Sequence, residues 1–221
     1  MIINNIKIQS DGYVYCKSGF YSALDIISRH YTYSFNNGIN ELRGEIDSQI
    51  WSVSYLLSMY KYRPKDFILF DTPRVAVNDE PMSLEQLSEY TCYVEDGIYP
   101  LFSTKDSVRK LVAKGLKKNK SDYSPDDIRD LFELDSERFE RPPKAVGNER
   151  IRAMAAIGYC HNKEVFCFPW LSDKRFKNFH NHFPWLLDKL TELKKVAIVP
   201  IGYENRSIVE DFMYNKFKLE D

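Results

Sequence analysis

The side chains best suited to holding a metal ion lie in two short stretches of the sequence. His180 and His182 flank an asparagine, and Cys160 is followed directly by His161. Imidazole and thiolate groups bind Zn²⁺ when about four of them converge, and such sites use recognisable short spacings. The spacing of these four residues matches none of the familiar patterns. We therefore expect no metal site.

Candidate nucleophiles and acids are equally isolated. Cys167 lies inside an apolar stretch, where packing in the core is the usual role of a cysteine. No Gly-x-Ser-x-Gly motif supplies an activated serine. The carboxylates of Asp71, Asp79 and Glu80 stand in stretches typical of turns and have no evident partner. These groups predict no covalent or general acid–base catalysis.

Charge is distributed unevenly along the middle of the chain. Residues 105–120 contain seven basic residues and one acidic residue, and residues 122–140 contain eight acidic and two basic residues. The simplest interpretation is two solvated helix faces that attract each other. The alternative is a patch that binds nucleic acid. The basic residues of this run are Lys105, Arg109, Lys110, Lys114, Lys117, Lys118 and Lys120.

The whole chain is nearly neutral, with 31 Lys and Arg against 32 Asp and Glu in 221 residues. This balance argues against a protein that bulk charge holds on nucleic acid. The length suits one domain, or one domain with a subdomain. No apolar run approaches the roughly 20 residues that cross a bilayer, and the start of the chain lacks the pattern of a signal peptide. We expect a cytoplasmic protein with reduced thiols.

Apolar periodicity predicts strands that alternate with helices. Predicted strands cover residues 1–8, 31–35, 67–70, 75–77, 165–168 and 196–199. A strand–loop–helix unit begins with a strand at residues 39–42, and its helix carries Val53, Leu56, Leu57 and Tyr60 on one face. This alternation predicts an α/β protein with a largely parallel sheet.

The predicted helices have recognisable starts. Ser83 and Gln86 have the spacing of a capping box, and Ser124 precedes a proline. We predict that residues 82–140 are mostly helical. A further helix begins near Gly147, with Ile151, Met154, Ala155 and Gly158 on one face, and another covers residues 184–193.

The order of these elements resembles the nucleotide-binding domain of ABC-type ATPases over most of the chain. Residues 21–44 resemble the approach to the phosphate loop, residues 145–156 the signature helix, and residues 163–172 the Walker B strand and the loop after it. The resemblance implies a P-loop NTPase-like α/β fold with a largely parallel central sheet and an antiparallel N-terminal β part. It also implies one domain over residues 1–221, with a small helical subdomain at 82–145.

The phosphate loop that this resemblance implies lacks the residues that bind phosphate and Mg²⁺. A working loop reads Gly-x-x-x-x-Gly-Lys-Ser/Thr, and its lysine and hydroxyl hold phosphate and Mg²⁺. Here Gln49, Ile50 and Trp51 take the places of the second glycine, the lysine and the hydroxyl residue, and Ser48 or Ser52 could help only in a shifted loop. The full set is Gly44, Glu45, Asp47, Ser48, Gln49, Ile50, Trp51 and Ser52.

Negative charge in this loop opposes nucleotide binding further. Glu45 and Asp47 stand where the family receives phosphate, and one like-charge contact at about 4 Å costs up to about 4 kcal/mol. ATP and Mg²⁺ should therefore bind weakly or not at all. The simpler interpretation of the loop is a polar turn, with Asp47 or Ser48 as the N-cap of the helix that follows.

The other motifs are eroded as well. The Walker B-like positions Phe168, Pro169 and Trp170 carry no carboxylate for Mg²⁺, and the last strand carries no switch histidine. If exposed, the cluster at 168–171 is a partner surface; if buried, it fills the emptied nucleotide site. The glutamine loop has Glu95 instead of glutamine. Tyr13 or Tyr15 could stack on adenine, although packing is the simpler role among 15 tyrosines.

The signature-like residues are Ala145, Val146, Gly147, Asn148, Glu149 and Arg152. In the family the signature helix faces the nucleotide of the partner, so the resemblance implies that Gly147, Asn148 and Glu149 face a second subunit.

These features favour a noncatalytic ABC-type homologue, a pseudo-ATPase that acts as a subunit or regulator of an ABC transporter system. It would form a homodimer, or a heterodimer with another ABC ATPase domain, and a membrane permease is a further potential partner. The protein would then be cytoplasmic, or peripheral to the membrane through the permease. One alternative is a degenerate P-loop module associated with nucleic acid, which only the basic run supports. The other is an active but atypical ATPase.

Overall fold

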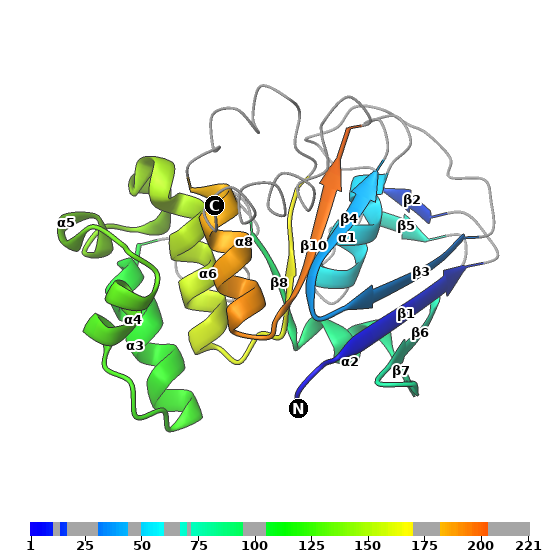
Figure 1. Cartoon of the computed structure of the whole chain (residues 1–221), viewed down its shortest axis with the longest axis horizontal. Coiled ribbons are helices and arrows are strands. Elements are labelled where there is room, and N and C mark those ends of the chain that lie inside the picture. The colour runs from blue at the N-terminus through cyan, green and yellow to red at the C-terminus, as the bar shows by residue number, and fades with distance from the viewer. Residues whose placement is uncertain are drawn as a thin grey trace, which may run out of the picture.

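The computed structural model describes residues 1–10, 14–16, 31–43, 50–59, 67–69, 72–94, 105–169 and 182–202, with only the backbone described at 14–16, 31, 50–52, 59 and 67–69. A parallel sheet runs through the centre of this part of the chain (Figure 1). Helices α6 (Arg150–Cys160) and α8 (Phe183–Glu192) cover one face of the sheet. Helix α1 (Ile50–Met59) and an antiparallel sheet lie on the other face.

The parallel sheet has the strand order β4-β10-β9-β8. All three neighbouring pairs are parallel, which the alternation of strands and helices predicts. Each step along the chain from one of these strands to the next passes through at least one helix. The strands are β4 (Gly38–Arg43), β8 (Thr91–Tyr93), β9 (Val165–Cys167) and β10 (Val196–Ile201).

The central strands divide the interior into two hydrophobic cores. Successive side chains of a strand point to opposite faces, so Ala197 and Val199 join the core under α6 and α8, whereas Val196 and Ile198 join the core under α1. All six residues of β10 are buried. This continuous burial is typical of a parallel strand covered on both faces.

The antiparallel sheet forms the N-terminal part of the fold, with the order β3-β1-β6-β7. In β1, Ile6 and Ile8 are fully buried, whereas Lys7 and Gln9 are exposed, so one face packs on the core and the other faces solvent. A separate two-stranded antiparallel sheet joins β2 (Val14–Cys16) and β5 (Phe67–Leu69). The larger sheet contains β1 (Asn5–Ser10), β3 (Tyr31–Asn36), β6 (Arg74–Val77) and β7 (Glu80–Met82).

Two of the predicted helix starts are confirmed as capping boxes. Ser83 caps α2 (Leu84–Ser88): its hydroxyl accepts from the backbone N–H of Gln86, whose side chain accepts from the N–H of Ser83. Ser124 caps α4 (Pro125–Leu131) in the same way with Asp127. Such caps satisfy N–H groups that have no partner within the helix.

The prediction that residues 82–140 are mostly helical is wrong in one place. The short helix α2 is followed by β8, which pairs with β9 and belongs to the central sheet. The boundary expected for the helical part at residue 82 therefore moves beyond β8. The helices that follow are α3 (Val108–Asn119), α4, α5 (Ser136–Phe139) and the 3₁₀ turns η3 (Pro143–Ala145) and η4 (Gly147–Glu149).

Helix α6 is buried on more sides than its predicted single apolar face. All residues from 152 to 158 are buried, because α3 packs on one side of α6 and the parallel sheet on another. Glycines permit both contacts: a Cβ on Gly115 would lie 2.7 Å from the carbonyl oxygen of Cys160, and one on Gly158 would lie 2.9 Å from Sγ of Cys92. Among the helices of the described segments, none has the length and apolarity needed to cross a membrane.

Candidate functional site

The carboxyl ends of the parallel strands meet at one edge of the sheet, the usual place for a ligand in an open α/β fold. Strand β4 ends at Arg43 and α1 begins at Ile50, so the lysine position of the predicted phosphate loop is the first residue of this helix. The loop itself, residues 44–49, lies outside the described residues. Trp51 and Ser52 belong to α1, and their side chains are not described.

Helix α1 is tied to the sheet by buried hydroxyl groups. Ser54 Oγ donates a hydrogen bond of 2.6 Å to the carbonyl oxygen of Phe168, directly after β9. Thr91 Oγ1 in β8 donates to the carbonyl oxygen of Leu57 at 3.0 Å. Both hydroxyls are buried and cannot bond to water, so without these hydrogen bonds each hydroxyl would be left without a partner. The first half of α1 is thereby held against the end of β9.

The end of β9 carries apolar side chains where the resemblance expects metal-binding carboxylates. Phe168 is fully buried, and its ring lies 5.2 Å from that of Phe183 in an edge-to-face contact. Pro169 is also buried. Phe168 therefore belongs to the core between the sheet and α8. Of the two alternatives for this cluster, an exposed partner surface or a buried filling, the burial of Phe168 favours the second. Trp170 lies outside the described residues.

The signature-like segment begins with two 3₁₀ turns and continues into α6. Ala145 ends η3, and Val146 is buried between the two turns. Gly147 has φ of +63°, which favours glycine, and a Cβ at this position would meet nothing within 4 Å. Gly147 and Asn148 are exposed, so both can be reached by a partner.

Glu149 does not face outward, contrary to the expectation for a residue that contacts a partner. It is only 7% exposed, and its carboxylate accepts from the backbone N–H of Asp135 at 3.0 Å and from Arg138 at 3.1 Å. Arg152 Nη2 lies 3.6 Å from the same carboxylate. Glu149 faces inward because three donors of the chain itself surround its carboxylate. Glu149 joins α5 to the start of α6.

Arg152 is a buried cation in this network. Its guanidinium lies 5.6 Å from the ring centroid of Trp185, and its second carboxylate neighbour is Glu133 at 3.8 Å. Trp185 Nε1 in turn donates to Glu133 at 3.1 Å. Arg152 Nε has no hydrogen-bond partner within the described part of the chain. These contacts connect α6 with α8, so Arg152 has a structural role.

The exposed carboxamide of Asn148 contacts two further elements. Arg138 Nη1 in α5 donates to Asn148 Oδ1 at 2.5 Å, and Asn148 Nδ2 lies 3.3 Å from His182 Nε2, directly before α8. Burial, followed by the charge of Arg152, lowers the pKa of His182. Asn148 is among the signature-like residues, but nothing in the sequence indicates that Arg138 and His182 lie beside it, since they are 10 and 34 residues away.

The thiols have the environment of packed core residues. Cys92, Cys160 and Cys167 are free and buried. Burial raises the pKa of the Cys92 thiol to about 11 and that of Cys160 to about 12, so neither forms a thiolate at neutral pH. His161 Nε2 lies 3.1 Å from the carbonyl oxygen of Leu111 and serves the contact between α3 and α6.

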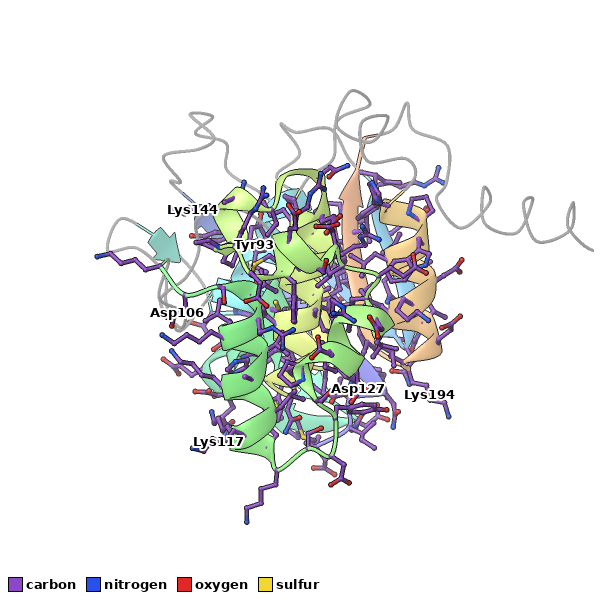
Figure 2. The ribbon with its side chains drawn as sticks, turned by 90° about the vertical axis from the view of Figure 1, so that its left-hand side faces the viewer. Tyr93, Asp106, Lys117, Asp127, Lys144 and Lys194 are labelled. Carbon is purple, nitrogen blue, oxygen red and sulfur yellow. The ribbon has the colours of Figure 1, made fainter. Side chains whose placement is uncertain are left out.

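Much of the basic run is neutralised by neighbouring acids. Arg109 pairs with Asp126 at 2.6 Å and with Glu140, and Asp106 binds both Lys110 and Lys114. Arg109 thus joins the basic run to the acidic block, in line with the attraction that the simpler interpretation predicts, whereas Asp106 lies within the basic run itself. Figure 2 shows Asp106 near one end of α3 and Lys117 near the other. Lys117, Lys118 and Lys120 are exposed.

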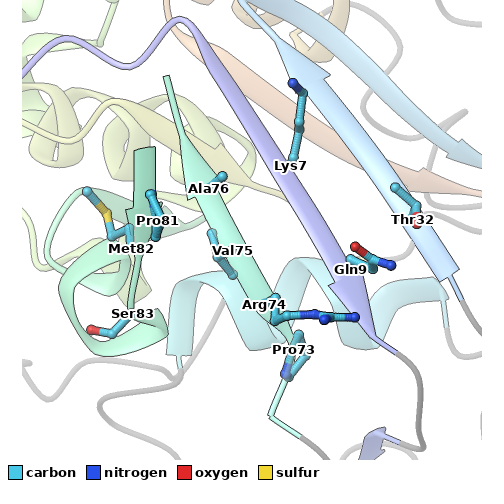
Figure 3. A pocket seen from close by; sticks show the side chains of 10 residues that line it. All are labelled: Lys7, Gln9, Thr32, Pro73, Arg74, Val75, Ala76, Pro81, Met82 and Ser83. Atoms are coloured by element: carbon cyan, nitrogen blue, oxygen red, sulfur yellow. The ribbon is translucent and has the colours of Figure 1, made fainter. Parts of the chain in front are cut away.

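A shallow hollow of about 590 Å³ lies on the solvent face of the antiparallel sheet, away from the edge described above (Figure 3). Ala76 of β6 is small and half-buried between Lys7 on one neighbouring strand and Pro81 on the other. Lys7 is already paired with Asp79 at 2.5 Å. The alternating sequence of β1 predicts an exposed face, but it does not predict a hollow there.

Three further predicted residues cannot be compared with the structure. Tyr13 and Glu95 lie outside the described residues, and Tyr15 lies in β2, where only the backbone is described.

Comparison with solved structures identifies the fold. The chain superimposes on a protein described as an ABC transporter (ATP-binding protein) from Pyrococcus furiosus with a TM-score of 0.58 and 14% identity, over 90% of this chain and 92% of that one. It also matches the ATP-binding cassette MJ0796, in a dimeric post-hydrolysis state with ADP and phosphate. The TM-score is 0.52 and the identity 12%, over 90% of this chain and 88% of that one.

No family model and no curated protein matches the sequence. The structural likeness extends over nearly the whole length of both solved chains, whereas the sequence identity is low. The chain therefore has the fold of an ABC-type ATP-binding domain.

Proposed function

We propose that this chain is a noncatalytic ABC-type domain that acts as a subunit or regulator of an ABC transporter system. One observation carries the proposal. The Walker B-like strand β9 is followed directly by buried Phe168 and Pro169, and the carbonyl oxygen of Phe168 accepts a hydrogen bond from Ser54 of α1. A carboxylate at this point would hold Mg²⁺ and polarise water, and neither residue can do so.

The start of α1 supports the same conclusion. A helix N-terminus favours anions, and the lysine of a working phosphate loop adds a positive charge there. In this chain the helix begins with Ile50, which supplies no charge. The preceding sequence adds Glu45 and Asp47, which repel phosphate. We propose that Mg-ATP binds this chain weakly or not at all.

The partner in this proposal is a second ABC ATP-binding domain. One of the structural neighbours named above is a dimeric ATP-binding cassette with ADP and phosphate. The exposed backbone at Gly147 and Asn148 would face the nucleotide held by an intact partner, and the helices between β8 and β9 would form the subdomain that approaches a permease. The whole chain would be one domain.

A reconstitution experiment tests this role. The chain is co-expressed with an intact ABC ATPase domain, and complex formation and ATP hydrolysis are measured with and without the chain. We expect a complex and a changed rate of hydrolysis by the partner. Gly147→Val should weaken both, because a β-branched residue is strained at φ of +63° while its Cβ has room. Lys117→Ala, at the exposed end of α3, is the matched control.

Absence of any complex, or an unchanged rate of hydrolysis, would contradict the proposal. No second function receives comparable support. The basic run that suggested nucleic acid has Arg109, Lys110 and Lys114 in ion pairs within the chain. Binding through counterion release requires cations that are free to neutralise phosphates.

A further inference from the structure

The carboxamide of Asn148 is held between two side chains from different elements. Arg138 comes from α5, and His182 precedes α8, whereas Asn148 lies in the exposed part of η4, before α6. The two contacts are 2.5 Å from Arg138 Nη1 to Asn148 Oδ1 and 3.3 Å between Asn148 Nδ2 and His182 Nε2. The side chain of this loop residue is thus fixed although the residue is exposed.

The chemistry of the three groups determines which nitrogen of His182 carries a proton. A guanidinium group can only donate, so the atom of Asn148 that faces Arg138 must be the oxygen. The amide nitrogen then faces His182 and donates to it, and Nε2 of His182 must accept. His182 is therefore neutral, with its proton on Nδ1. Protonation would place two donors against each other and break the contact.

The charges around His182 favour the same neutral state. Arg138 of α5 and Arg152 of α6 oppose a positive charge on the ring, and Glu149 of η4 favours one. Glu133 and Trp185 lie beyond Arg152 and are joined by a hydrogen bond of 3.1 Å. Burial and the two arginines outweigh Glu149, and they lower the pKa of His182.

We propose that Arg138, Asn148 and His182 form a proton-sensitive latch that fixes the exposed residues 147–148 of η4 when His182 is neutral and releases Asn148 when His182 is protonated. In the latched state the carboxamide is aligned by hydrogen bonds on both sides. In the released state it keeps only Arg138 and regains rotational freedom. The consequence for a partner rests on the proposed function: a subunit that docks on Gly147 and Asn148 would bind less tightly in acid.

The test measures the ring nitrogens of His182 by ¹⁵N NMR on the full chain between pH 8 and pH 5. We expect the Nδ1–H tautomer at pH 8 and a pKa below the ordinary value of about 6.5. His161 provides an internal control, since its Nε2 faces the carbonyl oxygen of Leu111 and must donate. The two histidines should therefore show opposite tautomers in one spectrum.

Two variants separate the latch from a general effect of burial. Asn148→Ala removes the donor that stabilises the neutral ring, so the pKa of His182 should rise by about 0.5 to 1. Asn148→Asp keeps the shape but provides an acceptor, so the rise should be larger. Neither change should move the pKa of His161. An Nε2–H tautomer for His182 at pH 8, or an unchanged pKa in both variants, would overturn the latch.

These measurements need neither nucleotide nor partner. If the reconstitution fails but the opposite tautomers and the shifts are found, the latch stands and the proposed role falls. If the partner binds but His182 does not respond to Asn148, the reverse holds.

Discussion

Replacing Glu149 tests whether this residue is a structural junction or a surface contact. Glu149→Ala removes a carboxylate that accepts from Asp135 and Arg138 and lies 3.6 Å from Arg152. Among the described residues, the buried guanidinium of Arg152 would then keep only the exposed Glu133, at 3.8 Å, as a counterion. Breaking a buried ion pair by removing one partner typically costs about 3 to 5 kcal/mol. A domain with about 5 to 15 kcal/mol in total would lose a large share of its stability.

Urea-induced unfolding, followed by circular dichroism, measures this loss. Glu149→Gln keeps the volume and one acceptor but loses the charge, so it should cost less, about 1.5 to 3 kcal/mol. Glu137→Ala is the matched control, since its carboxylate is 82% exposed and meets Arg141 only at 3.4 Å; its unfolding midpoint should match that of the wild type. A loss below about 1 kcal/mol for Glu149→Ala would refute the structural assignment of this residue.

Two other predictions concern the contacts of buried polar groups. Ser54→Ala removes the hydrogen bond to Phe168 and should lower the free energy of unfolding by about 1 to 3 kcal/mol; Ser34→Ala, on an exposed strand face, is the control, and equal effects in urea unfolding would contradict the reasoning. Burial lowers the pKa of His161 in the folded chain, so the folded state disfavours protonation. Stability should therefore be complete above about pH 6.5 and fall as the pH falls below it, and His161→Gln should flatten this part of the pH profile of the unfolding free energy.

The parallel sheet could be predicted because two of its strands, β9 and β10, are apolar throughout. Val165 to Phe168 and Val196 to Val199 need cover on both faces, and helices between them provide it. The helix starts at Ser83 and Ser124 are equally readable, since Ser83 and Gln86 have the spacing of a capping box and a proline follows Ser124. The strand Thr91–Tyr93 was missed, because three residues beside a helical stretch give no clear period.

The candidate site was less predictable, because its contacts join distant parts of the chain. The resemblance predicts that Glu149 faces a partner. The residues next to it in the sequence do not indicate that Asp135 and Arg138 contact its carboxylate. The ion pairs of Asp106 with Lys110 and Lys114 follow helix spacing, so pairs of this type are predictable from the sequence. The bond from Ser54 to Phe168 spans 114 residues and only the fold reveals it.

Titration of the purified chain with Mg-ATP by isothermal calorimetry tests the central claim most directly. Because Phe168 and Pro169 follow the Walker B-like strand and α1 begins with Ile50, we predict no saturable heat at nucleotide concentrations up to about 1 mM. ATP hydrolysis measured on the same sample should stay at the background rate. A dissociation constant in the micromolar range, with steady turnover that Ser52→Ala abolishes, would contradict the account.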